Sequence, residues 1–187
     1  EYALTKNLPV LQPVKIRAQE FVEELKALEP ELIVVVAFGQ FLPKDILQMP
    51  KYGCINVHAS LLPKYRGAAP IHYAIMNGET ETGVTIMMMD IGMDTGAMLA
   101  KSVIQISDEM TMGILHDQLK TVGAKLLLDV VEGLEKGTIM PVPQNNDEAT
   151  YASLLDKKIE KIEWNHTAQE IHNKVRGLNP WPGAHSV

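Results

Sequence analysis

The stretch L-I-V-V-V-A-F, residues 32–38, decides the fold class of this chain. It is apolar throughout and rich in β-branched side chains, which is typical of a central parallel strand that helices cover on both faces. Before it, apolar residues recur every three or four positions over residues 18–28, and Pro30 follows. This spacing predicts an amphipathic helix ahead of the strand. After it, residues 53–58 are expected to form a second buried strand.

The rest of the chain continues this alternation of helices and strands. Short helices are expected at 44–49 and 70–76, strands at 83–89 and 98–106, a long helix capped by residues 107–109 and ended by Gly137, and a last helix at 167–175. The alternation predicts an α/β fold with a mainly parallel sheet flanked by helices. Ligands of such sheets bind outside the carboxyl ends of the strands, where His58 and Gln40 lie.

The composition restricts the classes of function. The chain has 187 residues, 46% of them hydrophobic, and a net charge of −6, which argues against a broad basic nucleic-acid surface but leaves room for a local patch. Its longest apolar run, residues 32–38, is far shorter than the about 18 residues of a membrane span, so no membrane partner is expected. The single cysteine, Cys54, excludes an internal disulfide and suits a reducing cytoplasm.

Two polar residues interrupt the strand at 53–58. Asn56 and His58 are two positions apart, so their side chains project to the same face, roughly 6–7 Å from one another. An amide beside an imidazole at the end of a strand suggests a site for carbonyl chemistry. The alternative is a polar pair satisfied by nearby backbone groups.

A third candidate is Asp94, in the run I-G-M-D-T-G. Gly92 and Gly96 flank it and allow the backbone to bend tightly and approach a ligand. The alternative is a turn aspartate that bonds its own backbone. Acidic residues do not alternate after Asp90 as they do in calcium loops, so no metal is expected here.

Longer motifs identify a family. The run S-L-L-P-K-Y-R-G-A-A-P-I, residues 60–71, together with the three polar residues above, resembles the signature of the 10-formyltetrahydrofolate-dependent formyltransferases. The run R-G-L-N-P-W-P-G-A, residues 176–184, preceded by K-I-E-W, resembles the branch that acts on methionyl-tRNA. The resemblance spans essentially the whole chain. It implies the Rossmann-like formyltransferase fold, and formyl transfer from 10-formyltetrahydrofolate to the α-amine of initiator methionyl-tRNA for translation initiation.

The resemblance also implies roles for individual residues. Asn56 and His58 would stabilise the oxygen of a tetrahedral intermediate, and Asp94 would favour charged His58 and order a proton-relaying water. Arg66 belongs to the signature, but the sequence leaves open whether it meets substrate or shapes the turn. The residues expected to bind the folate donor, in the loop after strand 32–38, the signature run and the aspartate loop, are Gln40, Phe41, Leu42, Ser60, Leu61, Leu62, Pro63, Asp90 and Gly92.

Measured against that family, the chain is expected to be an internal fragment. The first strands of the fold would precede Glu1, and a more basic tRNA-binding β-barrel domain would follow Val187. Residues 1–175 would then be a partial catalytic domain and residues 176–187 a linker, with most tRNA contacts outside the chain. We expect the full-length protein to be a monomer. The shorter chain would expose a sheet edge, so we expect it to be poorly stable or to associate with other copies.

Several other functions remain open from the sequence. Glycinamide ribonucleotide and sugar-nucleotide formyltransferases use the same polar residues, although the N-P-W-P-G-A run weighs against them. A formyltetrahydrofolate hydrolase would let water replace the amine. A non-catalytic folate-binding fragment is the last alternative.

Overall fold

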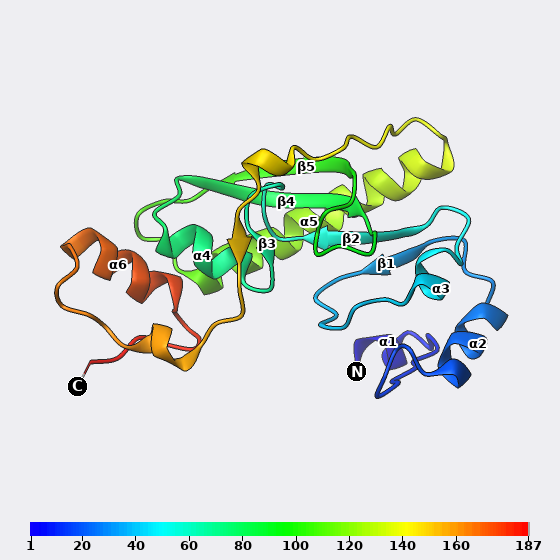
Figure 1. Cartoon of the computed structure of the whole chain (residues 1–187), viewed down its shortest axis with the longest axis horizontal. Helices are drawn as coiled ribbons and strands as arrows, with labels where there is room; N and C mark the ends of the chain where they lie inside the picture. Colours follow the sequence, from blue (N-terminus) through cyan, green and yellow to red (C-terminus); the bar gives the residue numbers. More distant parts are fainter. Residues whose placement is uncertain (187) are drawn as a thin grey trace.

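The computed structural model describes residues 1–186, and at its centre lies a four-stranded sheet in the order β1-β2-β4-β5 (Figure 1). β1 (Ile33–Val35) pairs in parallel with β2 (Cys54–His58). β4 (Glu81–Met88) pairs antiparallel with both β2 and β5 (Met98–Gln105). The α/β class is confirmed, but the sheet is mixed rather than mainly parallel. The short, helix-free connection between β4 and β5 allows only antiparallel pairing, because parallel strands need a long crossover.

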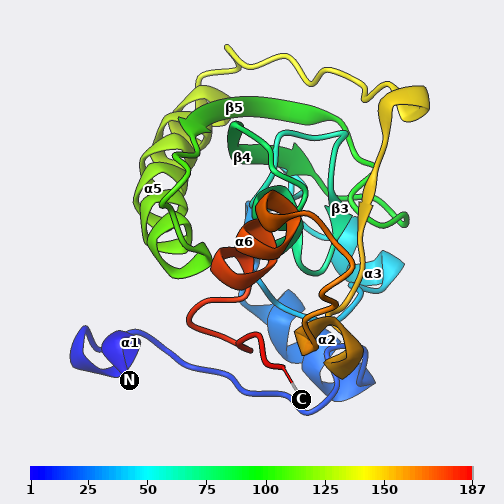
Figure 2. The ribbon, with the colours of Figure 1, turned by 90° about the vertical axis from the view of Figure 1, so that its left-hand side faces the viewer.

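Helices cover the sheet, and a small second sheet lies beside it (Figure 2). The helices are α1 (Tyr2–Thr5), α2 (Gln19–Ala27), α3 (Lys44–Leu47), α4 (Pro70–Met76), α5 (Met112–Glu135) and α6 (Ala168–Gly177), with 3-10 turns η1 (Asn146–Glu148) and η2 (Lys157–Glu160). The second sheet pairs β3 (Arg66–Gly67) in parallel with β6 (Tyr151–Ala152). Across residues 1–186, none of these helices combines the length and apolarity that a membrane crossing requires.

The predicted helices and strands are confirmed to within a few residues, except at the start of the long helix. α5 begins at Met112, where the Thr111 hydroxyl accepts a hydrogen bond from the N–H of Ile114 at 3.4 Å. Residues 107–110 instead form a turn. Gly137 follows the helix with a φ of +64°, as predicted for a residue that ends it.

β1 is not the covered central strand that its sequence suggests. Its inward face, through Ile33, packs on a cluster that includes Val22 of α2 and Ile46 of α3. On its other side Val34 is 40% exposed, and within residues 1–186 only β2 pairs with β1. The strand is therefore an edge strand with one covered face.

The main core lies between the sheet and α5 and orients β2. Ile55 of β2, Ile86 of β4 and Val130 of α5 are fully buried in one cluster, against which Val57 also packs. Because side chains alternate along a strand, Asn56 and His58 project from the opposite face of β2. This alternation aims both polar side chains away from α5, toward the turn that precedes β3 and the connection that follows β4.

Candidate active site

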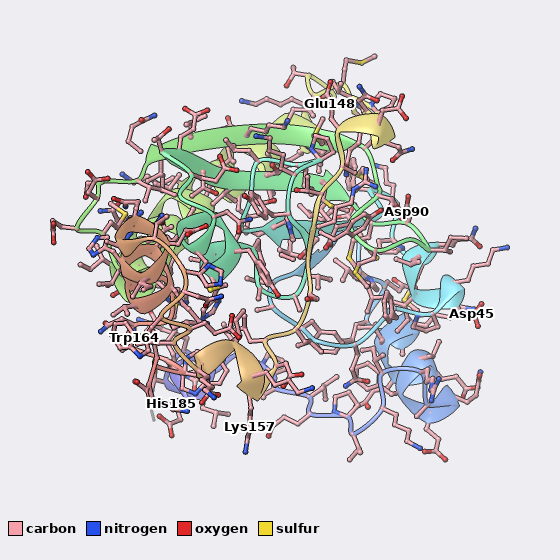
Figure 3. The ribbon with its side chains drawn as sticks, turned by 60° about the vertical axis from the view of Figure 1, so that its left-hand side comes forward. Asp45, Asp90, Glu148, Lys157, Trp164 and His185 are labelled. Atoms are coloured by element: carbon pink, nitrogen blue, oxygen red, sulfur yellow. The ribbon has the colours of Figure 1, made fainter. Side chains whose placement is uncertain are left out.

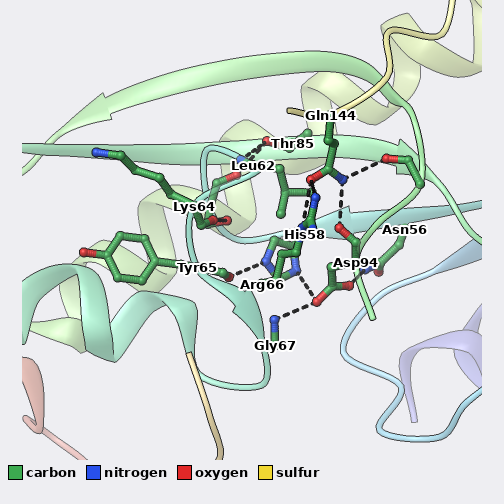
Figure 4. A network of polar contacts seen from close by, with 12 residues as sticks. Asn56, His58, Leu62, Lys64, Tyr65, Arg66, Gly67, Thr85, Asp94 and Gln144 are labelled. Atoms are coloured by element: carbon green, nitrogen blue, oxygen red, sulfur yellow. Dashed lines mark hydrogen bonds and ion pairs between the residues drawn. The ribbon is translucent and has the colours of Figure 1, made fainter. Parts of the chain in front are cut away.

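The structure brings together the three polar residues selected from the sequence (Figure 4). Asn56 and His58 come from β2, and Asp94 comes from the connection between β4 and β5. Asn56 Nδ2 donates to Asp94 Oδ1 at 3.5 Å, and His58 Nδ1 lies 3.7 Å from Asp94 Oδ2. We refer to these three residues as the polar cluster.

Both ring nitrogens of His58 face hydrogen-bond acceptors. Nε2 lies 2.9 Å from the carbonyl oxygen of Tyr65, and Nδ1 faces the Asp94 carboxylate. Since a carbonyl can only accept, Nε2 carries the proton in this contact. The side chain is only 6% exposed. The ring is therefore oriented by Tyr65 through Nε2, with Nδ1 turned toward the Asp94 carboxylate.

Asp94 is held by groups that are distant in the sequence. Its Oδ2 accepts a hydrogen bond from the backbone N–H of Gly67 at 2.8 Å. The turn residue that bonds its own loop is instead Asp90, whose Oδ1 accepts from the N–H of Gly92 at 2.9 Å and from the Thr95 hydroxyl at 2.6 Å. The Asp94 carboxylate is therefore free of its own loop and faces Asn56 and His58.

Arg66 and Gln144 form hydrogen bonds that support the loop carrying Asp94. Arg66 is 2% exposed and donates to Gln144 and Asn146, so in this structure it shapes the loops and lies within the protein. Gln144 in turn donates to the backbone carbonyls of Asp94 and Gly96. No sequence pattern marks Gln144, because it lies in an extended polar segment without periodicity.

The residues expected to bind folate fall into two groups by exposure. Ser60 and Leu62 are fully buried: the Ser60 hydroxyl donates to the Lys64 carbonyl at 2.6 Å, and the Leu62 N–H donates to Thr85 Oγ1 at 3.1 Å. Their side chains therefore build the turn after β2. Half-buried or exposed, and so accessible from outside, are Gln40, Phe41, Leu42, Leu61, Pro63, Asp90 and Gly92, of which Asp90 is labelled in Figure 3.

The loop after β1, which carries Gln40 and Phe41, makes no hydrogen bond to the described residues of the polar cluster. Phe41 is 71% exposed, and Gln40 accepts a hydrogen bond from the N–H of Ile16 at 3.1 Å. Among residues 1–186, no group of three or more His, Cys, Asp or Glu residues is placed to hold a metal ion.

Burial controls the titration of two groups near the site. It raises the pKa of the Cys54 thiol to about 11, which keeps this cysteine protonated and unsuited to act as a nucleophile. It also raises the pKa of Tyr65 to about 12, helped by the hydrogen bond from its hydroxyl to Glu79 at 2.6 Å. Tyr65 is thereby anchored at both ends, since its carbonyl accepts from His58.

The chain is similar to known formyltransferases in both sequence and structure. A methionyl-tRNA formyltransferase from Clostridium novyi (strain NT) is 53% identical over all 187 residues, and the chain spans 60% of that relative's length. The solved sugar N-formyltransferase from Shewanella sp FDAARGOS_354 matches with a TM-score of 0.82 at 21% identity, covering 100% of this chain and 74% of that one. This likeness confirms the formyltransferase fold.

A second solved structure and two family models extend the comparison. The N-formyltransferase from Helicobacter canadensis, in complex with folinic acid and dTDP-3-aminofucose, is 27% identical, with a TM-score of 0.75 over 94% of this chain and 62% of that one. The model described as formyl transferase matches residues 2–131, and that of the formyl transferase C-terminal domain matches residues 154–187. The chain therefore belongs to the formyl transferase family.

Proposed function

We propose that the protein transfers a formyl group from 10-formyltetrahydrofolate to the α-amine of methionyl initiator tRNA, in the cytoplasm, for translation initiation. The observation that carries this proposal is the polar cluster, in which an amide, an imidazole and a carboxylate converge at the end of β2. The choice of acceptor is supported by the 53% identity to a methionyl-tRNA formyltransferase.

The polar cluster suits the charge that develops in this reaction. The amine attacks the formyl carbon, and negative charge builds on the formyl oxygen. Asn56 has two N–H donors, of which only one faces Asp94, so the second serves the formyl oxygen. The 3.7 Å separation of His58 Nδ1 and Asp94 Oδ2 is longer than a hydrogen bond, so an N–H at Nδ1 remains available to the formyl oxygen.

Asp94 completes the proton balance. Its carboxylate stabilises the positive charge of His58 and orders a water molecule. Through that water, the proton lost by the attacking amine reaches folate N10 as the bond from the formyl carbon to N10 breaks. The products are formylmethionyl-tRNA and tetrahydrofolate.

We assign the folate donor to the exposed side of the loops around the polar cluster. The exposed Phe41 ring and the half-buried Leu61 and Pro63 offer apolar surface to a flat heteroaromatic ring, and Gly92 and Asp90 offer polar groups to its edge. Ser60 and Leu62 support this surface from within. The folinic acid complex of the Helicobacter canadensis relative supports a folate ligand for this fold.

The tRNA substrate is assigned mainly to regions outside residues 1–175. We take these residues as the catalytic domain and residues 176–187 as the link to a tRNA-binding domain, with the intact protein a monomer. The C-terminal domain model matches residues 154–187, which supports a second domain, although this match overlaps the proposed catalytic domain at residues 154–175.

One comparison of acceptors tests the proposal. The intact protein is incubated with 10-formyltetrahydrofolate and either methionyl-tRNA, glycinamide ribonucleotide, a dTDP-amino sugar or no acceptor, and both formyl transfer and formate release are measured. Transfer to methionyl-tRNA alone is expected, and N-acetylmethionyl-tRNA, with its amine blocked, is the control. Formate release without an acceptor would identify a hydrolase, and transfer to another amine would identify a different formyltransferase.

A further inference from the structure

The Gln144 side chain is the centre of a hydrogen-bond network that the proposed mechanism does not use. We propose that Gln144 is a positioning residue: backed by Arg66, it fixes the backbone turn that aims the Asp94 carboxylate at His58. This inference rests on the proposed function, because Asp94 matters here as a member of the reacting cluster.

The orientation of the Gln144 amide is determined by its neighbours (Figure 4). Its Oε1 accepts from Arg66 Nε at 3.0 Å and from Arg66 Nη2 at 2.7 Å. Its Nε2 donates to the carbonyl of Asp94 at 2.7 Å and to that of Gly96 at 2.8 Å. A guanidinium can only donate and a backbone carbonyl can only accept, so a flipped amide would lose all four hydrogen bonds.

Arg66 gives this network a fixed support. Its side chain is almost fully buried, and among residues 1–186 no carboxylate lies within ion-pair distance of it. The guanidinium is held by the amide oxygens of Gln144 and of Asn146, the latter at 2.8 Å. Since a buried charge is costly without hydrogen bonds, Arg66 and Gln144 hold one another in place.

The network closes a ring around Asp94. Arg66 reaches the Asp94 carbonyl through Gln144, while its neighbour Gly67 in β3 donates its backbone N–H to the Asp94 carboxylate. Asp94 has a φ of +54°, in the left-handed region that costs an L-residue free energy. Loss of the Gln144 contacts would let this turn relax and draw the carboxylate away from His58, although every member of the polar cluster is still present.

The substitution Gln144→Glu separates the two halves of the network. Its carboxylate still accepts from Arg66, but it replaces the donor toward the two carbonyls with an acceptor. In the intact protein, kcat for formyl transfer is expected to fall by about 100-fold, as for a misplaced reacting group, with the KM for the folate donor unchanged. Asn146→Ala is the matched control, because it removes a hydrogen bond from the same guanidinium and leaves the Asp94 loop untouched. Its kcat should stay within about threefold of wild type.

A second background shows whether Gln144 acts through Asp94. In Asp94→Asn protein, Gln144→Glu should add little further loss, whereas equal fold-losses in both backgrounds would overturn the inference. A wild-type kcat in folded Gln144→Glu protein would also overturn it. Should that variant not fold, Gln144→Asn, which keeps the amide but shortens its reach, carries the same two expectations. Failure of the wild-type protein to transfer formyl groups would instead refute the proposed function, and with it the premise of this inference.

Discussion

The backbone N–H of Gly67 donates to the Asp94 carboxylate at 2.8 Å, across 27 positions of sequence. This contact ties the signature loop after β2 to the connection between β4 and β5. The carboxylate is thus oriented by a backbone group of the protein itself, which is what a preorganised site for developing charge requires.

Gly67→Ala should therefore disturb both stability and the site. Gly67 has a φ of +116°, and a Cβ there would lie 2.5 Å from the carbonyl oxygen of Ala152 in β6. We expect the free energy of unfolding to fall by about 2–3 kcal/mol and formyl transfer to slow, because strain and clash act together.

Urea denaturation measures the free energy of unfolding of Gly67→Ala and of a matched control, Gly137→Ala. Gly137 also has a positive φ, of +64°, but nothing lies within 4 Å of the position of a Cβ. It should lose about 1 kcal/mol and keep its activity. Equal losses in the two variants would show that the approach to Ala152 is unimportant.

Stability should fall at alkaline pH. Burial raises the pKa of Cys54 from 9.0 to about 11 and that of Tyr65 from 10.0 to about 12 in the folded chain. The unfolded chain releases these protons first, so the stabilisation is present below pH 9 and is lost as the pH rises through 11 and 12. The melting temperature should drop over this interval, and less so in a Cys54→Ala, Tyr65→Phe double variant. An identical drop in that variant would contradict the assignment.

Cys54 should also resist thiol reagents. It is 1% exposed, and its Sγ donates to the carbonyl of Ile46 at 3.5 Å. Reaction with a disulfide reagent at pH 8 should be slow in the native protein and fast in urea, because only the exposed thiolate reacts. Rapid native labelling would mean that α3 opens readily.

The free edge of β1 should promote association of the 187-residue chain. Val34 is 40% exposed in an edge strand, and such edges pair with other chains. The weight-average mass in sedimentation should rise with concentration, and Val34→Lys should suppress the rise. Val14→Lys is the control, because Val14 is 91% exposed but lies outside the sheet. Concentration-independent monomers of the unsubstituted chain would contradict this prediction.

Local pattern was enough to predict most of the helices and the polar cluster. The alternation along β2 put Asn56 and His58 on one face, and the glycine-flanked run identified Asp94, so these side chains could be chosen from sequence. The beginning of α5 was less certain, because both Ser107 and Thr111 are good capping residues and only the packed structure selects Thr111.

Features that depend on distant neighbours were not predictable in the same way. The apolar composition of β1 is the same for a covered strand and an edge strand, and only the pairing partners distinguish them. Gln144 contacts Arg66 across 78 positions and Asp94 across 50, so no local spacing marks it. The mixed character of the sheet likewise depends on a connection whose direction the strand pattern does not specify.

The most direct test is single-turnover formyl transfer to methionyl-tRNA by the intact protein and its Asn56→Ala, His58→Ala and Asp94→Asn variants. If the polar cluster stabilises the reacting formyl group, each folded variant should transfer about 10²–10³-fold more slowly while still binding a folate analogue. A near-normal transfer rate in any one of the folded variants would contradict the role of that residue, and near-normal rates in all three would contradict the assignment of this cluster as the active site.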